Sequence, residues 1–127
     1  MMKSSCGCQC PRTLGSTVDQ GRPLNEVKAD LFKGLAHSVR VRVLELLSEH
    51  GEQSVGELLA ALQLEASHLS QHLRVLRGYG LVASERRGSA VHYRLAHESV
   101  GELLAAARVL LGDVVAERRA YAEAAAQ

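Results

Sequence analysis

The chain has 127 residues, which predicts one small domain and is short for an enzyme that binds a cofactor. Its formal net charge is +1, so charge alone does not identify a nucleic-acid binder, and such a role must rest on where the basic residues cluster. Aromatic residues make up only 3% of the chain, and Leu, Val and Ala dominate its 46% hydrophobic fraction, as is typical of helices packed through aliphatic side chains.

Residues 1–22 contain many Ser, Gly, Thr and Gln residues and no repeating apolar face, so we expect a flexible arm. Within it, the segment CGCQC holds all three cysteines, Cys6, Cys8 and Cys10. Their odd number and tight spacing do not suit a disulfide framework, which favours a reducing cytoplasm. The N-terminus lacks the apolar run of a signal peptide, and no run of about 18 apolar residues could span a membrane. We therefore expect a soluble, cytoplasmic protein.

Two amphipathic helices are predicted after Pro23. The first covers LNEVKADLFKGLA and the second covers SVRVRVLELLSEH, each with an apolar stripe at helical spacing. The alternation VRVRV is also typical of a strand, but its continuation into LELLSEH and the stop at Gly51 favour a helix. The cap of the second helix is either His37 or Ser38.

A helix-turn-helix is predicted next. SVGELLAALQL forms a short helix in which Ser54 can cap the amide of Glu57, and EASHLSQHLRVLRGYG follows after about four residues. In this second helix three leucines recur at i, i+4 and i+7 and are expected in the core: Leu69, Leu73 and Leu76. The polar side chains then occupy its other faces: Ser67, His68, Ser70, Gln71 and Arg74.

A hairpin and a long helix complete the predicted fold. LVASER and AVHYRL alternate around RGS, as strands of a hairpin do, and an apolar stripe runs from about Ser99 to Ala122. We predict a mainly α fold with a small β-hairpin wing, in the order α-α-α-α-β-β-α. The domain is expected to cover residues 23–122, with residues 123–127 as a C-terminal tail.

The predicted helix-turn-helix and hairpin point to DNA. Hydroxyl, imidazole, amide and guanidinium groups on the second helix can read base edges in a major groove, and no acidic residue interrupts the helix from Ala66 to Arg77. Arg86 and Arg87 lie at the hairpin tip, where they can approach the phosphate backbone or the minor groove, and Arg40 can add a phosphate contact. The alternative is a solvated amphipathic face, but the preceding turn and the following basic hairpin favour DNA binding.

These segments closely resemble the ArsR/SmtB family of winged-helix repressors over about residues 28–122. The family pattern A-x-x-x-R is present at 36–40, S-x-x-S-x-H-L-x-x-L at 67–76, G-L-V at 80–82 and Y-x-L at 93–95. The resemblance implies a non-enzymatic homodimer that packs through its first and last helices. It also implies binding to palindromic double-stranded operator DNA, which an inducer releases, with no cofactor required for DNA binding.

Two departures from the family pattern narrow the choice of inducer. The family's C-V-C or C-V-G thiol element is replaced by Ser54, Val55 and Gly56. On the final helix, the positions that match the family's zinc and nickel site are occupied by a set that cannot form its four-ligand arrangement: His97, Ser99, Leu110 and Asp113. Neither familiar metal site is therefore expected.

The thiols at Cys6, Cys8 and Cys10 are the remaining candidate sensor. Three thiolates can converge on a thiophilic ion such as arsenite, cadmium, mercury, lead or copper(I), whereas zinc would need a fourth ligand, for example from the partner subunit. Alternatives are a redox or reactive-sulfur response, a regulator whose tail is idle, and a small thiol redox enzyme or metal carrier. The absence of a C-x-x-C before a helix argues against the last of these.

Overall fold

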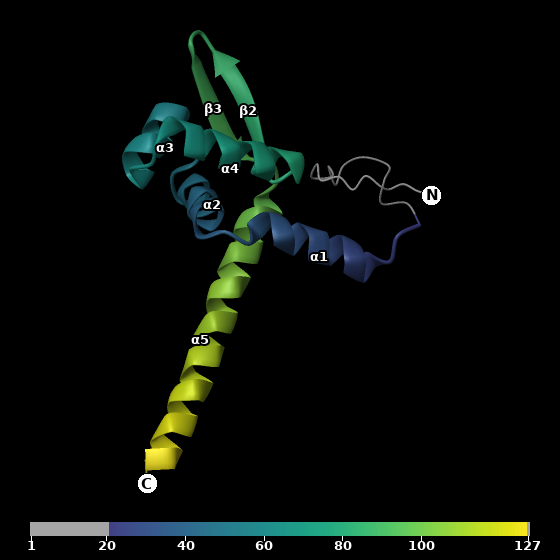
Figure 1. The fold of residues 1–127 in the computed structure, drawn as a ribbon, viewed down its shortest axis with the longest axis vertical. Coiled ribbons are helices and arrows are strands. Elements are labelled where there is room, and N and C mark those ends of the chain that lie inside the picture. The colour runs from purple at the N-terminus through teal and green to yellow at the C-terminus, as the bar shows by residue number, and fades with distance from the viewer. Residues whose placement is uncertain (1–20, 127) are drawn as a thin grey trace.

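The computed structural model describes residues 21–126, so the segment that holds Cys6, Cys8 and Cys10 lies outside the described residues. Figure 1 shows a compact head of short elements and one long helix that projects from it. The elements follow in this order: α1 (Leu24–Leu35), α2 (Ser38–His50), β1 (Gln53–Ser54), α3 (Val55–Leu62), α4 (Ala66–Gly78), β2 (Val82–Arg87), β3 (Ala90–Leu95) and α5 (Glu98–Ala126). The predicted fold class is confirmed, with β1 as an additional element.

Strands β2 and β3 form the wing, an antiparallel hairpin whose register runs from Val82 opposite Leu95 to Arg87 opposite Ala90. The tight turn between them contains Gly88, whose φ of 63° favours glycine. Strand β1 pairs with the outer edge of β3, which gives the sheet order β1-β3-β2. The two residues of β1 are too few to show an alternating pattern, so the sequence did not predict this strand.

The helix ends are set by local hydrogen bonds. His37 is the cap of α2, because its Nδ1 accepts a hydrogen bond of 3.1 Å from the amide of Val39. The predicted cap of α3 is confirmed as a full capping box: the Glu57 amide donates to Ser54 Oγ at 3.1 Å, and the Ser54 amide donates to Glu57 Oε1 at 2.8 Å. These bonds lower the pKa of Glu57, first through the Ser54 amide and then through its hydroxyl.

The hydrophobic core lies under α4 and joins it to α2, α3 and the wing. The three leucines predicted to be buried, Leu69, Leu73 and Leu76, are indeed in the core. Its other buried members are Val43, Leu44, Leu46, Leu47, Leu58, Leu81, Val82, Tyr93 and Val100. Each fully buried Leu contributes about 1.5–3 kcal/mol of transfer free energy, so the apolar side of α4 is firmly held and its polar side faces outward.

Helix α5 leaves the head soon after it begins. Val100 is its only buried residue, and the helix continues to Ala126, beyond the predicted end near residue 122. The exposed large apolar side chains along it are Val109, Leu110, Leu111, Val115 and Tyr121. Such a long uncovered apolar surface is typical of a helix that packs against another chain. Within residues 21–126, no helix combines the length and hydrophobicity needed to cross a membrane.

Helix α1 packs closely against the end of α4 at Gly34. A Cβ atom at this position would lie 2.7 Å from the ring of Tyr79, and the carbonyl of Gly34 accepts a 2.9 Å hydrogen bond from Arg40 Nε. We expect Gly34→Ala to lower the free energy of unfolding by about 1–3 kcal/mol, because the helices must separate. Urea unfolding followed by circular dichroism measures this change.

Gly112 in α5 provides the matched control for that substitution. Nothing lies within 4 Å of a Cβ added there, so Gly112→Ala should stabilise the helix by up to about 1 kcal/mol through its better helix propensity. Equal effects of the two substitutions would show that the contact with Tyr79 is not the cause.

Candidate nucleic-acid interface

The outward face of α4 carries the five side chains that the sequence predicts for DNA contact. All five are exposed, and together they line one open surface pocket: Ser67, His68, Ser70, Gln71 and Arg74. The structure therefore brings these predicted residues together on one face, opposite the buried leucines. Arg74 has no hydrogen-bond or ion-pair partner among residues 21–126, which leaves its guanidinium available to an outside acceptor.

The turn before α4 gives this helix its direction. Only three residues separate α3 from α4, and the first of them, Gln63, adopts a left-handed conformation with φ 56°. This conformation ends α3 and turns the chain sharply into α4, as a helix-turn-helix requires. At the other end, Arg77 donates a 3.4 Å hydrogen bond to Ser84 Oγ and so ties α4 to the wing.

A pair of histidines sits at the junction between α4 and the start of α2. The ring centroids of His37 and His72 are 4.3 Å apart, with their planes tilted by 46°. Burial lowers the pKa of His72, and the nearby charges of His37, Arg40 and His68 lower it further. The lowered pKa favours the neutral imidazole, which packs against His37 at the helix junction.

Arg40 is partly buried at the same junction. Its Nε donates to the carbonyl of Gly34, so the side chain ties the start of α2 to the end of α1. This hydrogen bond gives Arg40 a structural role. Its predicted phosphate contact stays a prediction.

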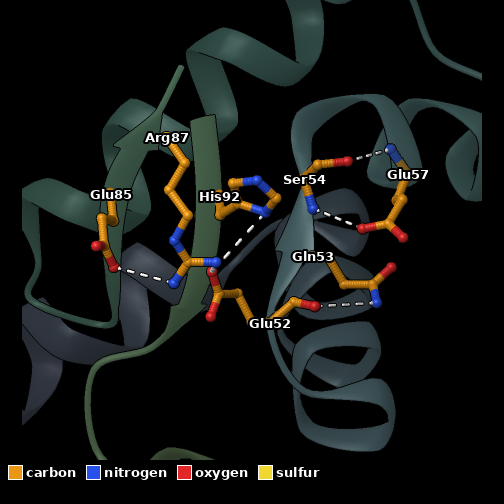
Figure 2. A network of polar contacts seen from close by, with 7 residues as sticks. All are labelled: Glu52, Gln53, Ser54, Glu57, Glu85, Arg87 and His92. Atoms are coloured by element: carbon orange, nitrogen blue, oxygen red, sulfur yellow. Dashed lines mark hydrogen bonds and ion pairs between the residues drawn. The ribbon is translucent and has the colours of Figure 1, made fainter. Parts of the chain in front are cut away.

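The wing places its two predicted cations in different surroundings. Arg86 is exposed and has no polar partner within residues 21–126. Arg87 is engaged by two carboxylates, with 2.7 Å from Nη1 to Glu52 Oε2 and 3.1 Å from Nη2 to Glu85 Oε1 (Figure 2). Hydrogen bonds to Glu85 and then to Glu52 raise the pKa of Arg87.

Glu52 and Glu85 are the residues of this region that sequence analysis missed. His92 Nδ1 lies 3.8 Å from Glu52 Oε2, and Figure 2 shows these side chains converging beside the strands of the wing. Glu52 belongs to the loop before β1, so only the pairing of β1 with β3 brings it to the hairpin. No periodicity or motif in the sequence marks that contact.

The predicted metal ligands are the three cysteines near the N-terminus. Cys6, Cys8 and Cys10 lie beyond the described residues. Within residues 21–126, no three His, Cys, Asp or Glu side chains are grouped closely enough to hold a metal ion.

Known proteins match this chain over most of its length. Residues 37–84 match the family described as bacterial regulatory protein, arsR family. The HTH-type transcriptional regulator Rv0081 of Mycobacterium tuberculosis is 49% identical over 105 residues, which cover 82% of this chain and 91% of the relative. The arsenical resistance operon repressor of Escherichia coli K12 is 45% identical over 65 residues, or 51% of this chain and 56% of the relative.

Solved structures show the same fold. The crystal structure of M. tuberculosis Rv0081 superposes with a TM-score of 0.71 at 50% identity, covering 76% of this chain and 96% of that one. The solution structure of the homodimeric winged helix-turn-helix domain of Mb0332 from Mycobacterium bovis gives a TM-score of 0.65 at 31% identity, with 77% and 88% covered. The winged helix-turn-helix architecture is thus shared with DNA-binding proteins of similar sequence.

Proposed function

This chain belongs to the arsR family of bacterial regulatory proteins, and from that premise we propose that it is a homodimeric repressor released from its operator by a thiophilic ion. In this proposal α4 enters the major groove and the wing contacts the backbone. The ion binds through Cys6, Cys8 and Cys10. The DNA-binding part rests on the outward face of α4, where five polar side chains line one open pocket that has no acidic residue in its lining.

The polar face of α4 suits sequence-specific contacts. Gln71 and Arg74 offer the amide and guanidinium groups that pair with adenine and guanine edges, and Ser67 and Ser70 can bond either bases or phosphates. His68 adds a further donor on the same face. Arg86 at the wing has the exposed charge that a phosphate contact needs, with Arg40 and Arg87 as the other predicted phosphate contacts.

The dimeric state is supported by the uncovered apolar surface of α5 and by two exposed apolar residues of α1, Leu24 and Phe32. Pairing these helices around a two-fold axis would remove the apolar side chains from water. Two α4 helices would then lie about 34 Å apart, one turn of DNA, which predicts an operator with two-fold symmetry. The homodimeric state of the Mb0332 domain supports this arrangement.

The thiophilic inducer is supported by the chemistry of three clustered thiolates and by the arsenical resistance repressor among the relatives. Arsenite, cadmium, mercury, lead and copper(I) suit three sulfur ligands, and zinc would take a fourth ligand from elsewhere. A redox or reactive-sulfur response of the same thiols is the second candidate, because closely spaced cysteines can form a disulfide or persulfide on oxidation.

A mobility shift on the DNA upstream of the gene, repeated with these ions and with thiol oxidants, tests the proposal. We expect arsenite or another thiophilic ion to release the operator from the wild type. Replacing Cys6, Cys8 and Cys10 together by Ser should abolish release and leave operator affinity without inducer unchanged. A coupling of about 1–3 kcal/mol corresponds to a shift of about 5- to 150-fold in affinity.

The outcomes separate the alternatives. Release by oxidants but not by ions would favour the redox response, and release that persists in the triple Ser variant would exclude the cysteines as the sensor. No response to any effector would indicate a regulator without this input. A protein that binds no duplex at any salt concentration would contradict the repressor role itself.

A further inference from the structure

Arg87 is the residue of the wing whose charge is already satisfied within the protein. Its two terminal nitrogens face different carboxylates, Glu52 at 2.7 Å and Glu85 at 3.1 Å (Figure 2). Glu85 lies on the same strand, whereas Glu52 comes from the loop between α2 and β1. The contact with Glu52 therefore joins the hairpin to the body of the domain.

The charge balance of this cluster opposes the approach of a phosphate. One guanidinium stands between two carboxylates, so the three groups together carry a charge of 1 − 2 = −1. A DNA phosphate that reaches Arg87 must displace a carboxylate and approach the other. Arg86, one residue earlier, meets no such competition within residues 21–126.

The ion pairs are exposed enough for DNA to compete with them. The side chain of Arg87 is 51% exposed and that of Glu52 is 31% exposed. At such exposure water and salt screen an ion pair strongly. Removing the charge of one carboxylate should therefore make Arg87 more available to a DNA phosphate without disturbing the core.

We propose that Glu52 competes with DNA for Arg87, so that the wing binds phosphate through Arg86 while Arg87 stays paired with its carboxylates. This inference rests on the proposed function, since it assumes that the wing contacts DNA. When one cation per wing is paired internally, the affinity for any duplex is lower, because each phosphate contact increases binding affinity independently of sequence. Base contacts from α4 then account for a larger share of the affinity, and discrimination between operator and random DNA improves.

The test is a salt titration of binding to a fluorescein-labelled mixed-sequence duplex, followed by fluorescence anisotropy between about 50 and 200 mM salt. For Glu52→Gln we expect binding about three- to tenfold tighter at the low end of this range. We also expect a plot of log affinity against log salt that is steeper by about 0.9 per wing. Arg87→Gln alone should leave the slope unchanged, because the guanidinium is already neutralised.

Two further variants make the test specific. The double variant Glu52→Gln, Arg87→Gln should return to the wild-type slope, since the released cation is gone. Glu49→Gln removes the same charge at the end of α2 from a carboxylate that pairs with Arg42 and His50 and not with Arg87, so it should leave the slope unchanged. Circular dichroism of every variant checks that each one is folded.

The inference is overturned if Arg87→Gln alone lowers the slope by about 0.9 per wing, because Arg87 would then already bind phosphate. It is also overturned if Glu52→Gln binds the duplex no more tightly than the wild type, or if Glu49→Gln reproduces its gain. A wild-type protein that binds no duplex would overturn the proposed function and this inference with it.

Discussion

Arg74→Ala is expected to abolish tight operator binding while leaving the protein folded. The side chain is exposed on the outward face of α4, within the pocket shared with Gln71 and opposite the buried leucines. A bidentate contact to a guanine edge is worth about 1–3 kcal/mol, and a dimer loses it at both half-sites. We therefore expect a loss of about 2–6 kcal/mol, which anisotropy titration of the upstream DNA can measure.

To interpret Arg74→Ala, binding is compared on two duplexes and with a control substitution at a second arginine. If Arg74 reads a base, the loss should fall on the upstream DNA and spare most of the affinity for a mixed-sequence duplex. Equal losses on both would instead assign Arg74 to a phosphate. Arg119→Ala removes the same charge near the far end of α5, well away from α4 in Figure 1, and should leave both affinities unchanged.

Much of the fold could be predicted from the sequence because local signals agree along the chain. The predicted second helix has the observed bounds, Ser38–His50, since its apolar stripe, its cap and Gly51 all act within a few residues. The Ser54 capping box and the buried leucines of α4 follow in the same way from spacing alone. The choice between His37 and Ser38 as a cap could not be made from the sequence, because both side chains can accept the same kind of hydrogen bond.

The candidate interface was predictable only in part. Helical spacing is enough to place the five polar residues of α4 on one side, because the buried side is fixed by three leucines. The surroundings of the cations were not predictable, because Arg40 and Arg87 find their partners through tertiary contacts. The pairing of β1 with β3 brings Glu52 to Arg87, and the packing of α2 against α1 brings Arg40 to Gly34.

The apolar side of α5 is the main part of the proposed dimer interface. From Leu103 the apolar residues recur at spacings of three and four through Ala107 and Leu110 to Val114, and Tyr121 follows seven residues later. This spacing keeps them on one side of the helix, as in the interface of paired helices. Residues at the start of this series lie near the head, whereas Leu110 and Tyr121 are 62% and 73% exposed.

Leu110→Glu should therefore convert the protein to a monomer and eliminate operator binding. An unpaired carboxylate buried at a helix interface costs about 3–5 kcal/mol, which corresponds to a rise of more than about 100-fold in the dimer dissociation constant. Sedimentation velocity over a range of protein concentrations measures that constant, and anisotropy measures operator binding in parallel.

The matched control is Val109→Glu, the same charge placed one residue earlier. Val109 comes nine residues after the buried Val100, or about two and a half helical turns, so it lies on the opposite side of α5. It is 66% exposed, and we expect its carboxylate to remain in water and the dimer to persist. If Val109→Glu dissociates the dimer and Leu110→Glu does not, the interface lies on the other side of α5. If both variants remain dimeric and bind the operator, α5 is not the dimer interface, and the surface around Phe32 in α1 becomes the next candidate.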